Sequence, residues 1–252
     1  MEMSFEVGAA LLPWEHPSMI RSVVIERRFR GPPDSGNGGY SCGLLASGAE
    51  GPMEVTLRKP PPLERALALS RGDGDKTLLL DGTTVIAEAV EAALDLELPA
   101  PVSLAAAEVA SLAFPWKTTH AFPMCFSCGP ENSEGLQIFS GPVPGRNVFA
   151  GPWVPSSTLP TDGGLIAPEI VWAALDCPGG VGAWMTNPIV EAIGLLGRMT
   201  ADIARRPAPG ERCVVLGWRL GVEGRKVFAG SALFSADGEL LGRSRQTWIL
   251  LS

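Results

Sequence analysis

A seven-residue pattern occurs twice in this chain, once in each half. It reads Lys-Pro-Pro-Pro-Leu-Glu-Arg at 59–65 and Arg-Pro-Ala-Pro-Gly-Glu-Arg at 206–212. Each copy follows one run of residues typical of a β-strand and precedes three more, with an Asp-Gly turn before the last run, at 81–82 and at 237–238. The repetition predicts two diverged copies of one folding unit.

Each half also carries one short apolar segment ahead of these strands. Residues 38–46 are rich in small side chains, and the apolar positions of 168–176 follow helical spacing. Pro168 is a start signal and the Cys-Pro-Gly-Gly run at 177–180 is a stop signal, so the second helix is expected to end at Asp176. The predicted strands are 53–57, 66–69, 77–80 and 84–90 in the first half and 197–203, 213–220, 226–234 and 240–251 in the second.

These elements predict an α+β protein of two tandem units, each with an antiparallel sheet wrapped around one central helix. Four or five curved strands can enclose a helix, and two such sheets placed side by side remove one exposed edge from each. We expect the first unit at 1–98 and the second at 135–252. Residues 99–134 form a proline-marked connector with local structure of its own.

Composition excludes several functional classes. Hydrophobic residues make up 46% of the 252 and charged residues 19%, which supplies a sizeable core and argues against disorder. The net charge of −7 provides no basic field for nucleic acid or an acidic membrane. The N-terminal residues lack a basic region followed by an apolar core, and no stretch is long enough for a membrane span, so a soluble cytoplasmic protein is expected. Five cysteines do not form a disulfide framework.

The order of helix, strand, proline turn and three strands, repeated, resembles the hot-dog fold superfamily and in particular its double hot-dog, acyl-CoA thioesterase II-like branch. Residues 37–46 resemble the Gly-Gly helix opening of that branch, followed by its basic-Pro turn at Lys59 and Pro60. Residues 237–246 resemble its last hairpin, whose strand carries a functional Gln, and Gln246 is the matching position. That branch places an Asp near the start of the strand after the second helix, and residues 196–200 contain none.

The resemblance implies hydrolysis of an acyl thioester at the seam between the two units, in lipid metabolism. A helix N-terminus from one unit would hold the thioester carbonyl, and an acidic residue on the helix of the other unit would act on it. Here the first helix has the open Gly38-Gly39 start without a carboxylate, and the second has Glu169 and Asp176 without the Gly pair. One composite site is therefore expected, with the second seam degenerate.

We assign candidate roles on this basis. Unpaired N–H groups at a helix start stabilise an oxyanion, and Gly permits close approach to it, which suits Gly38 and Gly39. Asp176 is the candidate general base or nucleophile, with Asn37 or Gln246 orienting water or substrate. Each also has a structural interpretation: a helix-end partner for Asp176, an N-cap for Asn37, a cross-strand partner for Gln246 and a helix-dipole role for Glu169. Cationic candidates for CoA phosphates include Lys59 and Arg206.

Two further motifs are weaker. Residues 39–43 match the Gly-x-Ser-x-Gly nucleophile pattern, but a turn-rich loop precedes them where a buried strand is required. Cys125 and Cys128 form a Cys-x-x-Cys knuckle with His120 nearby. We interpret it as a structural loop in preference to a metal site, and a metal site in preference to a redox pair. Cys177 or Cys213 would have to complete a metal site.

The expected function is thus an acyl-CoA thioesterase-like hydrolase that needs no cofactor and binds an acyl-CoA or a similar thioester. It is expected to bind neither nucleic acid nor membrane, and it can form a homo-oligomer. One alternative is a protein that binds an acyl ligand without catalysis. Another is an enoyl-thioester hydratase, although His16 and His120, the two histidines of the chain, both lie outside the predicted helices.

Overall fold

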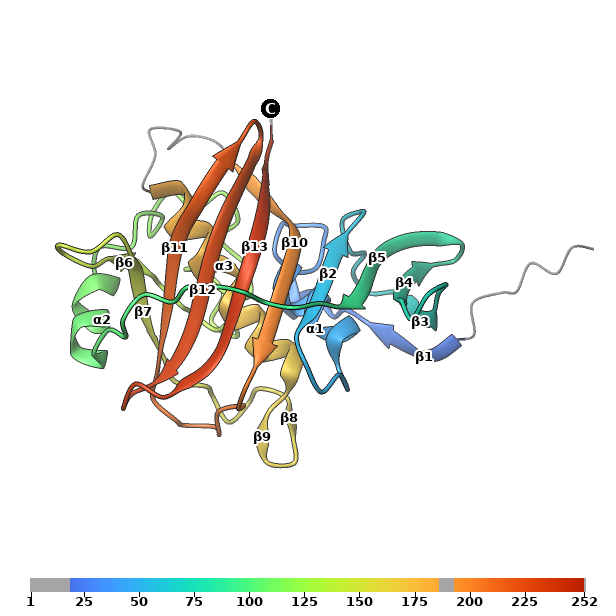
Figure 1. The fold of residues 1–252 in the computed structure, drawn as a ribbon, viewed down its shortest axis with the longest axis horizontal. Coiled ribbons are helices and arrows are strands. Elements are labelled where there is room, and N and C mark those ends of the chain that lie inside the picture. Colours follow the sequence, from blue (N-terminus) through green and yellow to red (C-terminus); the bar gives the residue numbers. More distant parts are fainter. Residues whose placement is uncertain (1–18, 186–192, 252) are drawn as a thin grey trace, which may run out of the picture.

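A computed structural model describes residues 19–185 and 193–251. Its strands form one 11-stranded sheet in the order β1-β3-β4-β5-β2-β10-β13-β12-β11-β7-β6, and all pairings are antiparallel. Helices α1 and α3 lie together behind this sheet (Figure 1).

The elements of the first half are β1 (Met19–Val24), a 3-10 turn (Arg27–Phe29), α1 (Gly38–Ala46), β2 (Met53–Leu57), β3 (Ala66–Arg71), β4 (Thr77–Asp81) and β5 (Thr84–Glu91). The connector contributes α2 (Leu104–Ser111). The second half contains β6 (Gly141–Pro142), β7 (Phe149–Trp153), β8 (Thr161–Asp162), β9 (Leu165–Ile166), α3 (Pro168–Met185), β10 (Gly194–Ile203), β11 (Cys213–Glu223), β12 (Lys226–Ser235) and β13 (Leu240–Leu250).

The strand order reveals two equivalent halves that meet at β2 and β10. Outward from that junction the first half continues β5, β4, β3 and β1, and the second continues β13, β12, β11 and β7. Both copies of the repeated proline pattern fall at the same place, between the junction strand and the next strand along the chain. The repeat therefore marks two units of one topology. Their boundaries at 98/99 and 134/135 stay a prediction.

The seam between the units is a continuous backbone ladder. Residues 53–56 of β2 pair antiparallel with residues 198–201 of β10, and Glu54 lies 3.2 Å from Arg198 across it. Because each junction strand would otherwise be a sheet edge, their pairing satisfies N–H and C=O groups that would attract other chains.

Helix α1 coincides with the predicted segment 38–46, but the prediction that the second helix ends at Asp176 is wrong. Helix α3 runs through Pro178 to Met185. The middle of α3 lies against the sheet at backbone distance: a Cβ at Gly217 of β11 would lie 1.7 Å from the Pro178 carbonyl oxygen, and a Cβ at Gly179 would lie 2.1 Å from Gln246 Oε1. Pro178 has no N–H for the Ala174 carbonyl one turn earlier, and the carbonyls on either side of it, of Ala173 and Leu175, accept hydrogen bonds from the Ser127 and Ser231 hydroxyls. None of the described helices is long and apolar enough to cross a membrane.

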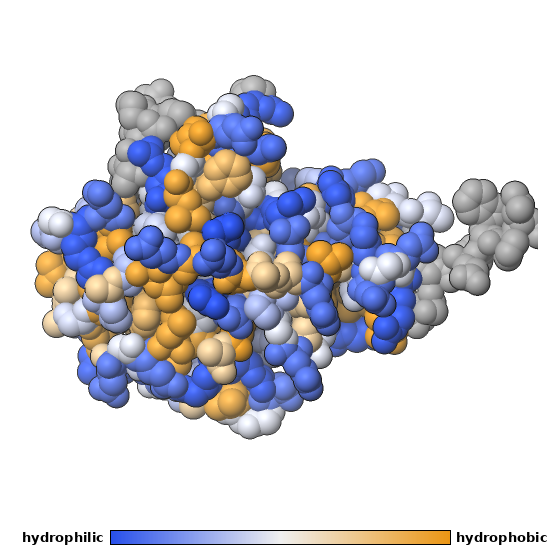
Figure 2. Space-filling model, in the orientation of Figure 1, coloured by the Kyte–Doolittle hydropathy of each residue, from blue (hydrophilic) through white to orange (hydrophobic). Residues whose placement is uncertain are grey.

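The connector covers the opposite face of the sheet. After β5 the chain crosses in front of the second unit's strands and reaches α2 at the far edge (Figure 1). Leu94, Leu96 and Val102 pack there against a core that includes Leu216 and Trp218 of β11. Figure 2 shows apolar residues interspersed with polar ones over this face. The connector thus shields apolar strand residues that would otherwise face water.

Because α3 approaches β11 so closely, a single methyl group added at Gly217 should lower the stability of the protein strongly. Gly217→Ala should destabilise the protein by about 1–3 kcal/mol or more, because the new Cβ meets the backbone of α3 at Pro178 and Gly179, which cannot move aside as a flexible side chain could. Gly51→Ala is the matched control, since nothing lies within 4 Å of a Cβ there. Chemical denaturation measures both, and equal midpoints for the two variants would contradict this packing.

Candidate active site

The start of α1 meets the middle of α3 at the buried centre of the seam. Asn37 caps α1, its Oδ1 accepting the Tyr40 N–H at 2.9 Å. Two residues later, the Gly39 N–H donates to Oδ2 of Asp176 at 2.9 Å. A Cβ at Gly39 would lie 2.6 Å from both the Asp176 Cβ and the Trp172 carbonyl oxygen, so only glycine allows this approach. The structure therefore brings the two predicted halves of a composite site into direct contact.

Asp176 is a buried carboxylic acid that its surroundings satisfy only in part. The residue is 2% exposed, and its Oδ1 accepts no hydrogen bond from residues 19–185 or 193–251. Burial raises the pKa of Asp176 to about 7; the Gly39 N–H lowers it, the nearby Cys125 raises it and the Asn37 amide lowers it. An oxygen without a partner at such depth is typical of a functional group rather than of a structural one.

A cavity of about 270 Å³, the seam cavity, opens onto this pair. Asn37, Gly38 and Asp176 line it, and Lys59 lies in its wall with Arg58. No hydrogen bond among the described residues engages the Gly38 N–H, so this donor is open to a ligand. The seam cavity thus combines a helix-start N–H group, an acid oxygen and two cationic side chains.

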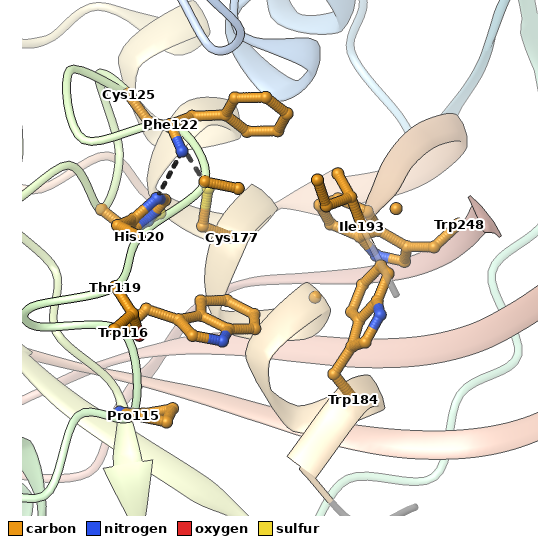
Figure 3. Close-up of a pocket in the computed structure, with 14 residues that line it drawn as sticks. Pro115, Trp116, Thr119, His120, Phe122, Cys125, Cys177, Trp184, Ile193 and Trp248 are labelled. Atoms are coloured by element: carbon orange, nitrogen blue, oxygen red, sulfur yellow. Dashed lines mark hydrogen bonds between the residues drawn. The ribbon is translucent and has the colours of Figure 1, made fainter. Parts of the chain in front are cut away.

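A second and larger cavity, of about 480 Å³, adjoins the first. We call it the tryptophan cavity, after Trp116 of the connector, Trp184 of α3 and Trp248 of β13, which lie around it (Figure 3). The two cavities share five lining residues: Phe122, Cys125, Cys177, Gly194 and Trp248. The two cavities therefore adjoin at these residues, with Lys59 in the wall of the first and the three tryptophans around the second.

Gln246 lies under α3 and lines neither cavity. Its Nε2 donates to the Leu175 carbonyl at 2.6 Å, and its Oε1 accepts the Trp248 indole N–H at 2.8 Å. Because both the nitrogen and the oxygen of the amide are hydrogen-bonded, we interpret Gln246 as a residue that positions the turn of α3 just before Asp176. Asn37 does line the seam cavity, but its main contacts are the helix cap and a 3.2 Å donation to Ser127 Oγ.

The remaining predicted residues lie at the other end of the helix pair. Arg206 pairs with Asp162 at 3.2 Å and lines a separate cavity beside the start of α3. Glu169 lies in the first turn of α3 against Gly43 of α1, where its charge favours the helix dipole. Pro168, the first residue of α3, has no N–H group. The α3 start therefore lacks the donor that Gly38 provides at the α1 start.

The Cys-x-x-Cys knuckle packs directly against the composite site. The thiols of Cys125, Cys128 and Cys177 lie within 4.8 Å of one another. Hydrogen bonds from Cys128 and Cys177 hold the pKa of Cys125 well below its usual range, whereas the same contact with Cys125 raises the pKa of Cys177. His120 accepts the Phe122 N–H at Nδ1 and lies 3.1 Å from Cys128 Sγ through Nε2. His16 lies outside the described residues.

Several residues around the site could not be identified from the sequence. Ser127 donates to the Ala173 carbonyl at 2.6 Å and so fixes the knuckle to α3. Trp116 and Phe122 come from the connector, which has no repeat partner and no regular periodicity. No signal in the sequence indicated that this connector would fold back onto the second helix.

Comparisons with known proteins bear on the fold. No protein-family model matches the sequence, and no curated protein matches it. The tesB protein of Mycobacterium avium subspecies paratuberculosis has a similar structure, with a TM-score of 0.59 at 12% identity over 88% of this chain and 90% of that one. Acyl-CoA thioesterase II TesB2 of Mycobacterium marinum gives 0.54 at 12% over 90% and 91%. A hot-dog protein of unknown function from Alicyclobacillus acidocaldarius gives 0.57 at 11% over 92% of each chain.

These similarities confirm the predicted fold class. Because each spans about nine tenths of both chains, the whole arrangement of two hot-dog units is shared rather than one unit alone. The chain therefore has a double hot-dog fold of the α+β class. At such low identity the comparison shows the architecture, and the residues of the seam must carry the functional argument.

The position of Gln246 predicts a structural phenotype. Gln246→Met has a similar length but leaves the Trp248 indole N–H unpaired in the core, so the free energy of unfolding should fall by about 1–3 kcal/mol. Arg245→Ala, on the exposed face of the same strand, removes only a solvent-exposed hydrogen bond to the Asp95 carbonyl and should change it by about 0.5 kcal/mol or less. Urea unfolding compares the two. An unchanged stability of Gln246→Met would show that the amide does not hold this part of the structure.

Proposed function

We propose that the protein hydrolyses an acyl thioester, with acyl-CoA as the substrate class, in the seam cavity. The observation that supports the proposal is the contact between the α1 start and Asp176, together with the cavity that Gly38 and Asp176 both line. Neither half of the chain forms this arrangement alone.

The donor side of the site acts on the thioester carbonyl. As the carbonyl carbon becomes tetrahedral, its oxygen gains negative charge, and the Gly38 N–H at the positive end of α1 can stabilise that charge. The Gly39 N–H is next to it but is held by Asp176 Oδ2. Gly38 is thus the primary donor, and Gly39 fixes the carboxylate.

The acid side supplies the reactive oxygen. With Oδ2 held by Gly39, Oδ1 of Asp176 is the atom that can accept a proton from a water molecule beside the carbonyl. The water oxygen then bonds to the acyl carbon, the carbon–sulfur bond breaks, and the thiolate leaves with the proton that Asp176 returns. Products are a carboxylic acid and the free thiol of the carrier.

The two cavities suit the two ends of such a substrate. Lys59 and Arg58 are exposed at the wall of the seam cavity, where phosphates of CoA would meet positive charge, although Arg58 also pairs with Glu88. The apolar tryptophan cavity lies beyond Asp176, where the acyl group would extend. Arg206 lines the separate cavity beside the start of α3, so it does not contact the ligand in this binding mode.

Removal of the carboxylate tests the proposal. Asp176→Asn keeps the shape of the side chain but cannot act as a base, so kcat for CoA release should fall about 100-fold or more. Asp73→Asn, an exposed carboxylate away from both cavities, is the control and should retain full activity. Chromatographic detection of free CoA across a panel of acyl-CoAs measures both. Equal activity of wild type and Asp176→Asn would contradict the assignment.

The same panel distinguishes the other functions of this fold. Thermal stabilisation by acyl-CoA with no release of CoA would identify a binding protein without catalysis. Formation of a 3-hydroxyacyl-CoA from an enoyl-CoA would identify a hydratase. Either result would overturn the hydrolase proposal.

The size of the tryptophan cavity should set the acyl preference. Trp116→Ala widens it, so the ratio of kcat/KM for long over short acyl chains should rise about tenfold or more. Leu112→Ala, an exposed apolar residue on the same connector, should leave this ratio unchanged. An unaltered preference in Trp116→Ala would place the acyl group elsewhere.

A further inference from the structure

A cluster of three thiols remains unexplained by thioester hydrolysis. Cys125 and Cys128 come from the connector and Cys177 from the middle of α3, so residues distant in sequence converge on one point. Figure 3 shows Cys125 beside Cys177. Their sulfur atoms lie within 4.8 Å of one another, and the Cys125 and Cys177 sulfurs are 3.6 Å apart. Convergence of this kind in the described part of the chain is confined to these three residues.

We infer that Cys125, Cys128 and Cys177 form a binding site for one thiophilic metal ion, with Zn²⁺ as the expected occupant. A tetrahedral ion with Zn–S bonds of about 2.3 Å keeps two sulfur ligands about 3.8 Å apart, close to the observed 3.6 Å separation. Thiolate ligands favour zinc and similar soft ions over magnesium or calcium. The inference is independent of the proposed hydrolysis.

The surroundings of the cluster are those of bound thiolates. Donors already point at the sulfurs: the backbone N–H groups of Ser127 and Cys128 at Cys125 Sγ, and the Asn37 amide at the same atom, at 3.8 Å. Such outer hydrogen bonds delocalise the charge of metal-bound sulfur and fix its direction. The knuckle is itself anchored to α3 by the Ser127 bond to the Ala173 carbonyl. Cys125, and with it the knuckle, is thus held in place by contacts that do not involve the ion.

His120 is an outer contact of this site rather than a fourth ligand. Its Nδ1 accepts the Phe122 N–H, so the neutral ring carries its proton on Nε2, which faces Cys128 Sγ at 3.1 Å. A nitrogen that carries a proton cannot bind the ion. All three cysteines line the tryptophan cavity, and a water molecule from that side completes the coordination. Zn²⁺ binds the cysteines as thiolates, so each sulfur that is still protonated loses its proton to solvent, and no electron is transferred.

The test is the metal content of the full-length protein, purified under reducing conditions, stripped with a chelator and then titrated with Zn²⁺. Wild type should bind one zinc ion per chain, and the affinity of Cys177→Ala should be at least about tenfold lower. Cys213→Ala is the matched control, because this buried thiol lies outside the cluster. Zinc uptake by Cys177→Ala equal to that of wild type would overturn the proposal.

A second measurement does not depend on whether the variants fold. Wild type loaded with ¹¹³Cd²⁺ should show one NMR resonance in the range of sites with several thiolate ligands. Absence of that resonance, or no uptake of either ion by the fully reduced protein, would contradict a metal site. A disulfide between Cys125 and Cys177 in the protein isolated without reductant, found by mass spectrometry together with no metal uptake, would overturn it in favour of a redox pair.

Discussion

The hydrogen bond between the Gly39 N–H and the Asp176 carboxylate depends on how closely two helices from different units approach each other. That approach requires glycine on α1, because a side chain at position 39 would collide with the backbone of α3. It also requires α3 to contact the backbone of the sheet, which is possible because residue 217 of β11 is a glycine. The site therefore exists because two helices and one sheet are packed at backbone distance.

The same constraint explains why the two seams differ. The strand order is symmetric about the β2–β10 junction, and the two helices are packed in a corresponding way. The start of each helix therefore lies against the other helix. One start presents the Gly39 N–H to a buried acid and leaves the Gly38 N–H open to a ligand, whereas the other begins with Pro168. Duplication thus supplied two equivalent positions, and the side chains made one of them suitable for chemistry. The thiol cluster lies at that same position and ties the connector to α3 one residue after Asp176.

Much of this architecture could be predicted from the sequence, for identifiable reasons. The repeated proline pattern, the Asp-Gly turns and the alternation of strand residues are local signals, and α1 and β2 have the predicted bounds. The continuation of α3 through Pro178 could not be predicted, because it depends on a distant strand that accepts the helix at close range. The roles of Trp116 and Cys177 likewise depend on where the connector folds, which no periodicity in it indicates. Asp176 and Gly39 were identifiable as residue types, but their contact is a property of the packed units.

The most direct test of this account is a crystal structure of the protein with a non-hydrolysable acyl-CoA analogue in which a methylene group replaces the thioester sulfur. The ketone oxygen is predicted to lie about 3 Å from the Gly38 nitrogen, with Asp176 Oδ1 facing the carbonyl carbon and the acyl chain in the tryptophan cavity. An analogue bound instead beside Arg206 and Pro168, or with its carbonyl remote from Gly38, would contradict the claim that the α1 start and Asp176 form the active site.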